Sequence, residues 1–204
     1  MGTDISGVIE IRAADGRWET EVGLMDFQLG RDRSAWECLF GFGNSDDIQR
    51  PLFDSRGLPP DASDWVRETG TEDFYGHSHT CATWAEVAAI DWDAPLADGP
   101  ARYWAARWRP GPTGELVRHD VVPATVDLAD AASDIFGGHM LLAPSQWPPG
   151  GEVPLDGAVY RPVILTARML VPPDEAPWAQ VWQTMRELAA DIGADNVRLV
   201  VWFG

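Results

Sequence analysis

The sequence has no lysine, few cysteines and no long apolar run, and these absences narrow the classes of protein it can belong to. All 15 of its basic residues are arginine, a usage that a high-GC codon bias explains without any function. The two cysteines, Cys38 and Cys81, form neither a CxxC pair nor a disulfide framework, so we expect free thiols in a cytoplasmic, soluble protein. Asp4 stands where a signal peptide needs a basic start, and no apolar run approaches the ~20 residues of a membrane span.

Motifs for common cofactor chemistries are also missing. The chain contains no GxGxxG, GxxxxGK[ST], GxSxG or HExxH pattern. Dinucleotide binding, P-loop chemistry, serine hydrolysis and zincin chemistry therefore have no motif support, and we predict no cofactor. Both cysteines fall in or beside apolar helical segments, which favours buried, inert thiols over nucleophiles.

Negative charge is what the sequence has in excess. Its net charge is -17, and the first 102 residues carry 20 acidic and 8 basic side chains, against 12 and 7 in the remainder. Such a field repels nucleic-acid phosphates and anionic lipids, so binding to nucleic acid or to a membrane is not expected. A basic protein partner would instead be steered toward the chain. The alternative is that the acidity only keeps the protein in solution.

Hydrophobic periodicity predicts an α+β or α/β fold around a mixed β-sheet. Residues 5–11 alternate between apolar and polar, and the turn Asp15-Gly16 leads into a second strand at 18–22, which indicates an N-terminal hairpin. Residues 177–192 have the spacing of an amphipathic helix. The near-continuous apolar run 197–203 predicts a strand near the centre of the sheet.

We predict a single domain over residues 1–204, with an inserted Pro/Gly-rich elaboration at 95–173. Inside it we expect a hairpin with arms at 101–110 and 115–122, although the first arm could be helical, and the strongest strand of the chain at 158–171. Long loops of this kind usually serve recognition. Candidate anchors for a partner are three of its tryptophans, Trp104, Trp108 and Trp147.

Two histidines, His77 and His79, precede an apolar, helix-like run. Thr83 and Glu86 have capping-box spacing, which predicts that the helix begins after the histidines. On an extended strand both imidazoles would point to one face and could hold Zn²⁺ or Fe²⁺ with an aspartate as third ligand. The favoured interpretation is that one histidine hydrogen-bonds a helix N-terminus or a carboxylate while the other is exposed, so we predict no metal.

A turn containing Arg31 and Asp32 leads into a short helix, for which Ser34 and Glu37 have capping-box spacing. The Arg31 guanidinium and the helix dipole together suit a phosphate or carboxylate ligand. The simpler interpretation is a surface pair of Arg31 with Asp32, in which Asp32 is also the charge at the helix N-terminus.

The order of these motifs resembles an uncharacterised family of small phage-borne and bacterial proteins that begin Met-Gly-Cys-Asp-Ile-His. The resemblance covers roughly the first 92 and the last 30 residues, and 95–173 has no counterpart. The matching positions are Met1, Gly2, Asp4, Ile5, 30–32, 56–59, 76–78 and 197–203.

Because the family has no assigned activity, the resemblance implies organisation and not function. It implies a polar centre where the first strand, the Gly-Arg-Asp turn and the histidine loop meet, bounded by Asp4, Arg31, Asp32 and His77. This chain departs from the family at four positions. Thr3 and Ser6 replace its first Cys and His, Tyr75 replaces the Asp before Gly-His, and Ser34 or a shifted Arg33 replaces the Tyr of the turn.

Two functions of different class follow from these observations. The preferred one is a non-catalytic, acidic protein-binding module with a basic partner, such as an inhibitor of immunity or anti-defence type. The alternative is an enzyme or small-ligand binder acting on a phosphorylated or nucleotide-like molecule. There Arg31 would hold the anion with His79 as a further contact, His77 would be the general acid/base, and Asp4 or Asp32 would orient its ring.

Overall fold

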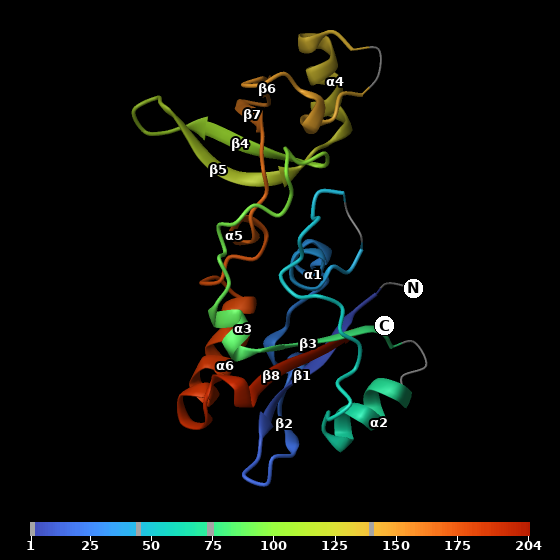
Figure 1. Cartoon of the computed structure of the whole chain (residues 1–204). Coiled ribbons are helices and arrows are strands. Elements are labelled where there is room, and N and C mark those ends of the chain that lie inside the picture. The colour runs from blue at the N-terminus through green and yellow to red at the C-terminus, as the bar shows by residue number, and fades with distance from the viewer. Residues whose placement is uncertain (1–2, 44–45, 73–75, 139–140) are drawn as a thin grey trace. The chain divides into compact units, whose positions relative to one another are not determined.

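A computed structural model describes residues 3–43, 46–72, 76–138 and 141–204 (Figure 1). Three residues that were compared with the uncharacterised family lie outside these ranges, namely Met1, Gly2 and Tyr75. The strands are β1 (Ile5–Arg12), β2 (Trp18–Gly23), β3 (His77–Thr83), β4 (Trp104–Pro110), β5 (Leu116–Pro123), β6 (Val153–Leu155), β7 (Ala158–Pro162) and β8 (Val197–Phe203). The helices are α1 (Arg33–Phe40), α2 (Asp64–Glu72), α3 (Trp84–Ala88), α4 (Val126–Phe136), α5 (Ala167–Leu170) and α6 (Trp178–Ile192), with short 3-10 turns η1 (Leu24–Phe27), η2 (Pro144–Gln146) and η3 (Ala194–Asn196).

The α+β class predicted from the sequence is confirmed, and the elements fall into two compact units. The first unit comprises residues 1–43, 51–92 and 171–204, and the second comprises 44–50 and 93–170. Each unit has its own four-stranded sheet. The second unit therefore contains nearly all of the elaboration that was expected at 95–173.

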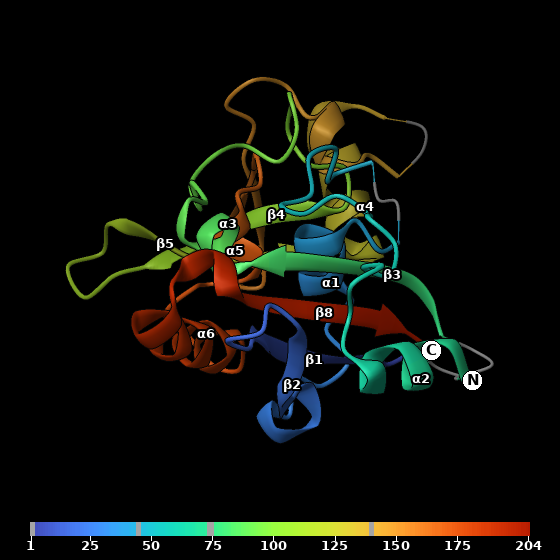
Figure 2. The same ribbon diagram turned by 60° about the horizontal axis from the view of Figure 1, so that its bottom comes forward.

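The sheet of the first unit has the strand order β2-β1-β8-β3. The predicted N-terminal hairpin is confirmed, and β8 lies between β1 and β3, as its apolar run indicated (Figure 2). Every pairing is antiparallel, so the expectation of a mixed sheet was wrong in this detail. The physical reason is that β1 and β3, which run in the same direction, are not neighbours, because β8 lies between them and runs opposite to both.

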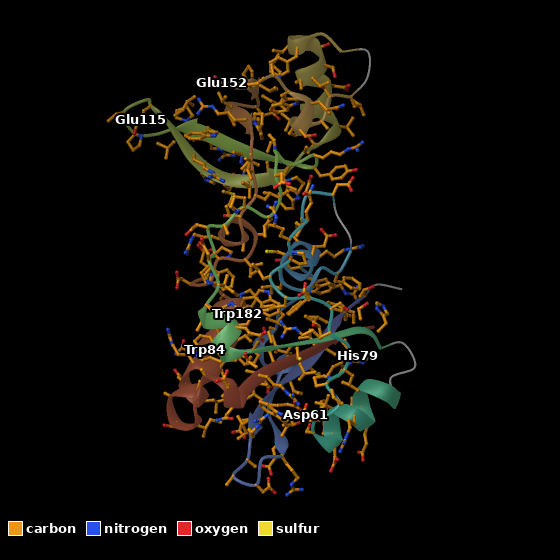
Figure 3. The ribbon with its side chains drawn as sticks, in the orientation of Figure 1. Asp61, His79, Trp84, Glu115, Glu152 and Trp182 are labelled. Carbon is orange, nitrogen blue, oxygen red and sulfur yellow. The ribbon has the colours of Figure 1, made fainter. Side chains whose placement is uncertain are left out.

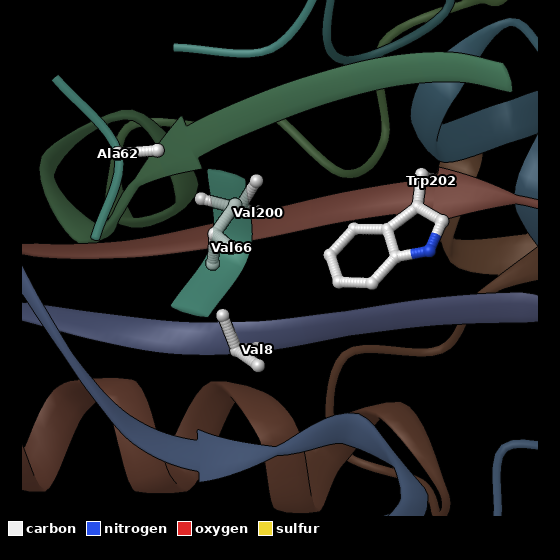
Figure 4. Packing of buried hydrophobic residues seen from close by; sticks show 5 residues of the cluster. All are labelled: Val8, Ala62, Val66, Val200 and Trp202. Carbon is white, nitrogen blue, oxygen red and sulfur yellow. The ribbon is translucent and has the colours of Figure 1, made fainter. Parts of the chain in front are cut away.

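Helices cover both faces of this sheet. Neighbouring residues of a strand point to opposite faces, so Phe203 and Trp202 of β8 define the two sides. On the first side, Phe40 of α1 packs on Phe203 and on Trp178 of α6. On the second side, α2 places Val66 over strands β1 and β8; Figure 4 shows this cluster, which consists of Val8, Ala62, Val66, Val200 and Trp202.

The cap of α1 differs from the prediction. Its N-cap is Asp32, whose Oδ1 accepts a hydrogen bond from the backbone N–H of Ala35 at 3.1 Å. Ser34 lies inside the helix, so its capping box with Glu37 was wrong. An aspartate directly before a helix competes well for the cap position, because its short carboxylate reaches the exposed N–H groups of the first turn and complements the helix dipole.

The sheet of the second unit has the order β5-β4-β7-β6, again antiparallel throughout. The hairpin expected here is confirmed, and its first arm is a strand. The long strand expected at 158–171 was wrong in length, because β7 ends at Pro162, which has no N–H for the ladder, and residues 167–170 form α5. One side of the sheet packs on α4 through a cluster of Ala105, Leu128, Ala132, Trp147 and Val153.

Candidate functional site

Asp4 and Arg31, two members of the predicted polar centre, form a direct ion pair. Arg31 Nε donates to Asp4 Oδ1 at 2.6 Å and its Nη2 donates to Oδ2 at 2.8 Å. The hydrogen bonds from Arg31 hold the pKa of the Asp4 carboxyl below its ordinary value. Both side chains are exposed. An anion that bound Arg31 would have to replace both of these bonds. Asp32, which was expected beside Arg31, is instead the N-cap of α1.

His77 and His79 lie on opposite faces of the sheet, which corrects the expectation that the pair would share one face. Ser78 between them has a positive φ of 54°, and the pairing of β3 with β8 shifts by one residue between His77 and Thr80. Because of this bulge, the His77 ring stacks on Phe42 at 5.7 Å and the His79 ring stacks on Trp202 at 6.2 Å. A bulge of one residue reverses the alternation of side chains, so an H-x-H pattern no longer shares a face.

The third member of the expected centre, His77, does not join the ion pair. It lies at the same end of the sheet as Asp4, because Asp4 exchanges backbone hydrogen bonds with Gly204 and His77 is in register with Phe203. Its ring Nδ1 is 3.0 Å from its neighbour Ser78 Oγ. In the described chain no hydrogen bond or ion pair connects this ring to Asp4 or Arg31. Over the same residues, no group of three metal-ligating side chains is found.

The three tryptophans expected to anchor a partner have different environments. Trp147 is only 5% exposed, packs on Phe136, and donates its indole N–H to the Leu142 carbonyl at 3.0 Å. It is a core residue, so the expectation of a surface anchor was wrong. Its ring is buried in the apolar cluster that α4 and β6 form. Trp104 and Trp108 are half-buried on β4.

A different site, which sequence reasoning missed, lies in the first unit between the β1–β2 hairpin and α2. It is a cleft of about 570 Å³, within the range of ordinary ligand sites. Figure 3 shows Asp61 between the hairpin and α2. The cleft is lined by residues 16–20 of the hairpin turn and β2, and by residues 61–65 and Arg67 from the start of α2.

A buried ion-pair network lies behind the wall of this cleft and reaches the cleft through Asp61 and Trp18. Arg198 Nε donates to Glu10 Oε2 at 2.7 Å, and its Nη1 donates to Asp61 Oδ1 at 2.8 Å. Glu10 is fully buried and the Arg198 side chain is 7% exposed. The Arg198 guanidinium also lies 3.9 Å from the ring centroid of Trp18, whose indole N–H donates to Asp61 Oδ2 at 3.0 Å. The network thus connects β1, β8 and the loop before α2 to Trp18 of β2.

Ser63 fixes the start of α2 on the same network. Its backbone N–H donates to Glu10 Oε1 at 2.8 Å, and its hydroxyl is 2.9 Å from Thr20 Oγ1 and 3.3 Å from the N–H of Val66. Both oxygens of the buried Glu10 carboxylate are therefore hydrogen-bonded. Since a buried charge is tolerated only when it is paired and fully bonded, the wall of the cleft is held rigidly.

The rim of the cleft carries an exposed aromatic ring. Trp65, the second residue of α2, is 47% exposed, and the inner side of its ring lies against Trp202 at 6.2 Å. An exposed tryptophan beside a polar cleft is typical of an interaction site, because one ring buries a large area at little cost in conformational entropy.

One sequence signal could have revealed this site. Arg198 interrupts the apolar run of β8, and Glu10 has a matching position in β1, where the two are directly paired across the strands. A charge of each sign in two strands expected to be central indicates a buried pair. The partners from β2 and the loop before α2 have no such signature, because their positions depend on the tertiary fold.

Comparisons with known proteins found no matching protein-family model, curated protein or solved structure. Within the described residues, no helix is both long enough and apolar enough to cross a membrane.

Proposed function

We propose that the protein is a non-catalytic binding module that captures a basic surface of another protein through the first unit, with the cleft between the hairpin and α2 as the point of contact. The observation that carries this proposal is the exposed Trp65 ring on a rigid, polar cleft in a strongly acidic unit. Such a module would act as an inhibitor of immunity or anti-defence type if the surface it covers is one that the partner needs.

The charge distribution supports this choice of partner. The first unit carries 8 arginines against 21 acidic residues, a net charge of -13, and the second carries 7 against 11, a net charge of -4. A field of this sign raises the encounter rate with basic proteins and opposes the approach of polyanions. The acidic unit is also the one that contains the cleft, so steering and contact involve the same unit.

The buried charged groups behind the cleft support a binding role, because they are already engaged in structure. Arg198 and Glu10 are buried together, and Asp61 accepts hydrogen bonds from Arg198 and Trp18. Such a network holds a fixed surface in place. The exposed ring of Trp65 then supplies the apolar area that a hot spot needs.

Affinity capture tests the proposal. The tagged chain should retain specific proteins from an extract of its native host, with retention falling steeply between about 0.15 M and about 1 M salt, where the Debye length shrinks from about 8 Å to about 3 Å. The identified partner, once purified, should bind the wild-type chain and bind Trp65→Ala weakly. Met25→Ala is the matched control, because Met25 is 91% exposed in the same unit and away from the cleft. A purified chain that binds no protein at low salt, or binding that Trp65→Ala leaves unchanged, would contradict the proposal.

A further inference from the structure

Among the described residues, two arginines each lie over a tryptophan ring and also donate to a carboxylate. In the first unit, Arg198 lies over Trp18 and is bonded to the carboxylates of Glu10 and Asp61. In the second unit, Arg161 lies 4.4 Å from the ring centroid of Trp108, and its Nε donates to Glu152 at 2.9 Å. Each site combines a tryptophan face with at least one carboxylate at the guanidinium edge.

This combination suits arginine better than lysine for physical reasons. A guanidinium is planar and weakly hydrated, so it can stack on an indole while its N–H fork donates to carboxylates in its own plane. An ammonium is compact and strongly hydrated, and it meets the same groups only as a point charge. A tryptophan with flanking carboxylates therefore discriminates between the two basic side chains.

The rim of the cleft presents the same groups toward solvent. Trp65 exposes about half of its surface, and none of the cation–π contacts in the described chain places an arginine over its ring. Asp64 precedes it on α2, and Asp61, at the floor, keeps 57% of its side chain exposed. The carboxylate of Asp64 is paired with Arg67 one turn along the helix, and both side chains are well exposed. Exposed pairs of this kind contribute little, so an incoming guanidinium can replace Arg67.

Resting on the proposed function, we infer that the cleft recognises an arginine side chain of the basic partner. The guanidinium stacks on the open face of Trp65 and donates to Asp64 and to the exposed edge of Asp61. Arg198 already bonds Asp61 from the interior of the protein, so the incoming arginine meets the exposed edge of the same carboxylate from the cleft. The partner is thereby defined as a protein with an arginine-rich exposed segment, in preference to a lysine-rich one.

Short capped peptides of glycine and arginine provide a direct probe. Their binding to the full-length chain can be measured by NMR titration of the tryptophan indole N–H signals, in parallel with the same peptides carrying lysine or the neutral arginine analogue citrulline. We expect the arginine peptide to bind at least about three-fold more tightly than the lysine peptide, and the citrulline peptide to bind weakest. The indole signal of Trp65 should shift most.

Variants locate the site. Trp65→Ala should lower the affinity for the arginine peptide at least about five-fold. Trp65→Tyr keeps an aromatic face and guards against misfolding, so it should retain part of that affinity. Met25→Ala should change nothing. Asp64→Asn should weaken binding more than Asp130→Asn, which makes the same change of charge on the exposed side of α4 in the second unit.

The outcomes separate this inference from the proposed function. Equal affinity for the arginine and lysine peptides, or arginine binding that is insensitive to Trp65→Ala, would overturn the arginine site while leaving capture of a basic partner intact. If the arginine peptide binds at Trp65 but no protein partner is retained at low salt, the site stands and the proposed function fails.

Discussion

Arg198 and Glu10 face each other directly across β8 and β1, and the Nε–Oε2 distance of 2.7 Å is spanned inside the protein, where Glu10 has no exposed surface. This pair supports the cleft from behind, because Glu10 accepts from the Ser63 N–H and Arg198 donates to Asp61. Its attraction is stronger than that of a surface pair because little water screens it, and each partner is tolerated in the interior only because the other is present.

Removing Arg198 alone should therefore be strongly destabilising. Arg198→Met leaves Glu10 as an unpaired buried charge, and we expect the free energy of unfolding to fall by about 3–5 kcal/mol. Urea unfolding followed by tryptophan fluorescence would measure this loss. Arg12→Met is a matched control, because Arg12 lies over the same Trp18 ring at 4.8 Å but is exposed, and it should cost less than about 1 kcal/mol. The double variant Glu10→Leu/Arg198→Met should recover part of the loss, and equal losses in the single and double variants would contradict this account.

Asp61 should give the protein a specific sensitivity to acid. The hydrogen bond from Arg198 is the main cause that lowers the pKa of the Asp61 carboxyl below 3.8, with a smaller contribution from Trp18. A carboxyl with a lowered pKa in the folded state stabilises the protein above its unfolded pKa, and that stability is lost as the pH falls through the folded pKa. Between about pH 5 and about pH 2, the wild type should therefore lose more unfolding free energy than Asp61→Asn does.

Urea unfolding at a series of pH values checks this expectation. Asp130→Asn serves as the control for the change in net charge, and it should follow the wild-type curve in shape. If Asp61→Asn and the wild type lose stability in parallel over the whole acidic range, Asp61 does not make the expected contribution.

Much of the first unit could be predicted from local patterns. The terminal strand was predicted at 197–203, where β8 lies, because a buried strand needs an apolar run and nothing else. The capping box of Thr83 and Glu86 is present, with both reciprocal hydrogen bonds formed, because its geometry depends on four consecutive residues. Features that depend only on neighbouring residues can be predicted from the sequence without knowledge of the tertiary fold.

The candidate site was harder to predict because it depends on bulges and on distant segments. Of the expected group of Asp4, Arg31 and His77, only Asp4 and Arg31 are in contact. The positive φ of Ser78 turns the two histidines to opposite faces, and nothing in the sequence indicates that φ. The cleft joins residues near positions 18 and 61, and Asp61 is held in place by Arg198. No spacing rule connects segments so far apart, and only the buried charge of Arg198 in an apolar strand pointed to them.

The two cysteines should differ sharply in reactivity. Burial raises the pKa of the Cys38 thiol to about 12, and Cys38 has no exposed surface. Cys81 is half-buried, and burial raises its pKa as well. Since the thiolate is the reactive form, a thiol reagent should modify Cys81 slowly in the native protein and Cys38 only on unfolding. Intact-mass measurement would show one modification per native chain, lost in Cys81→Ser and kept in Cys38→Ser. Modification of native Cys38 at the rate of Cys81 would contradict the packing described for α1.

Glycine is required at position 7 of β1 because Val200 and Leu24 leave no room for a side chain. A Cβ at this position would overlap the backbone carbonyl oxygen of Val200 and lie 2.9 Å from Leu24 Cδ1. The Leu24 side chain can move, but the carbonyl belongs to the central strand β8 and cannot shift without disturbing the ladder. We therefore expect Gly7→Ala to lower the free energy of unfolding by about 1–3 kcal/mol.

Gly99→Ala provides the comparison for Gly7→Ala. A Cβ at Gly99 would have no atom within 4 Å, so its effect should stay within about 0.5 kcal/mol of the wild type. Urea unfolding of both variants measures the difference. Because both substitutions add the same methyl group and restrict the unfolded chain equally, the gap between them reports the steric cost at β8 alone. Equal stabilities would mean that the β1–β8 ladder can relax around an added methyl group, and the Arg198–Glu10 pair three residues further along β1 would then be held less rigidly than its hydrogen bonds indicate.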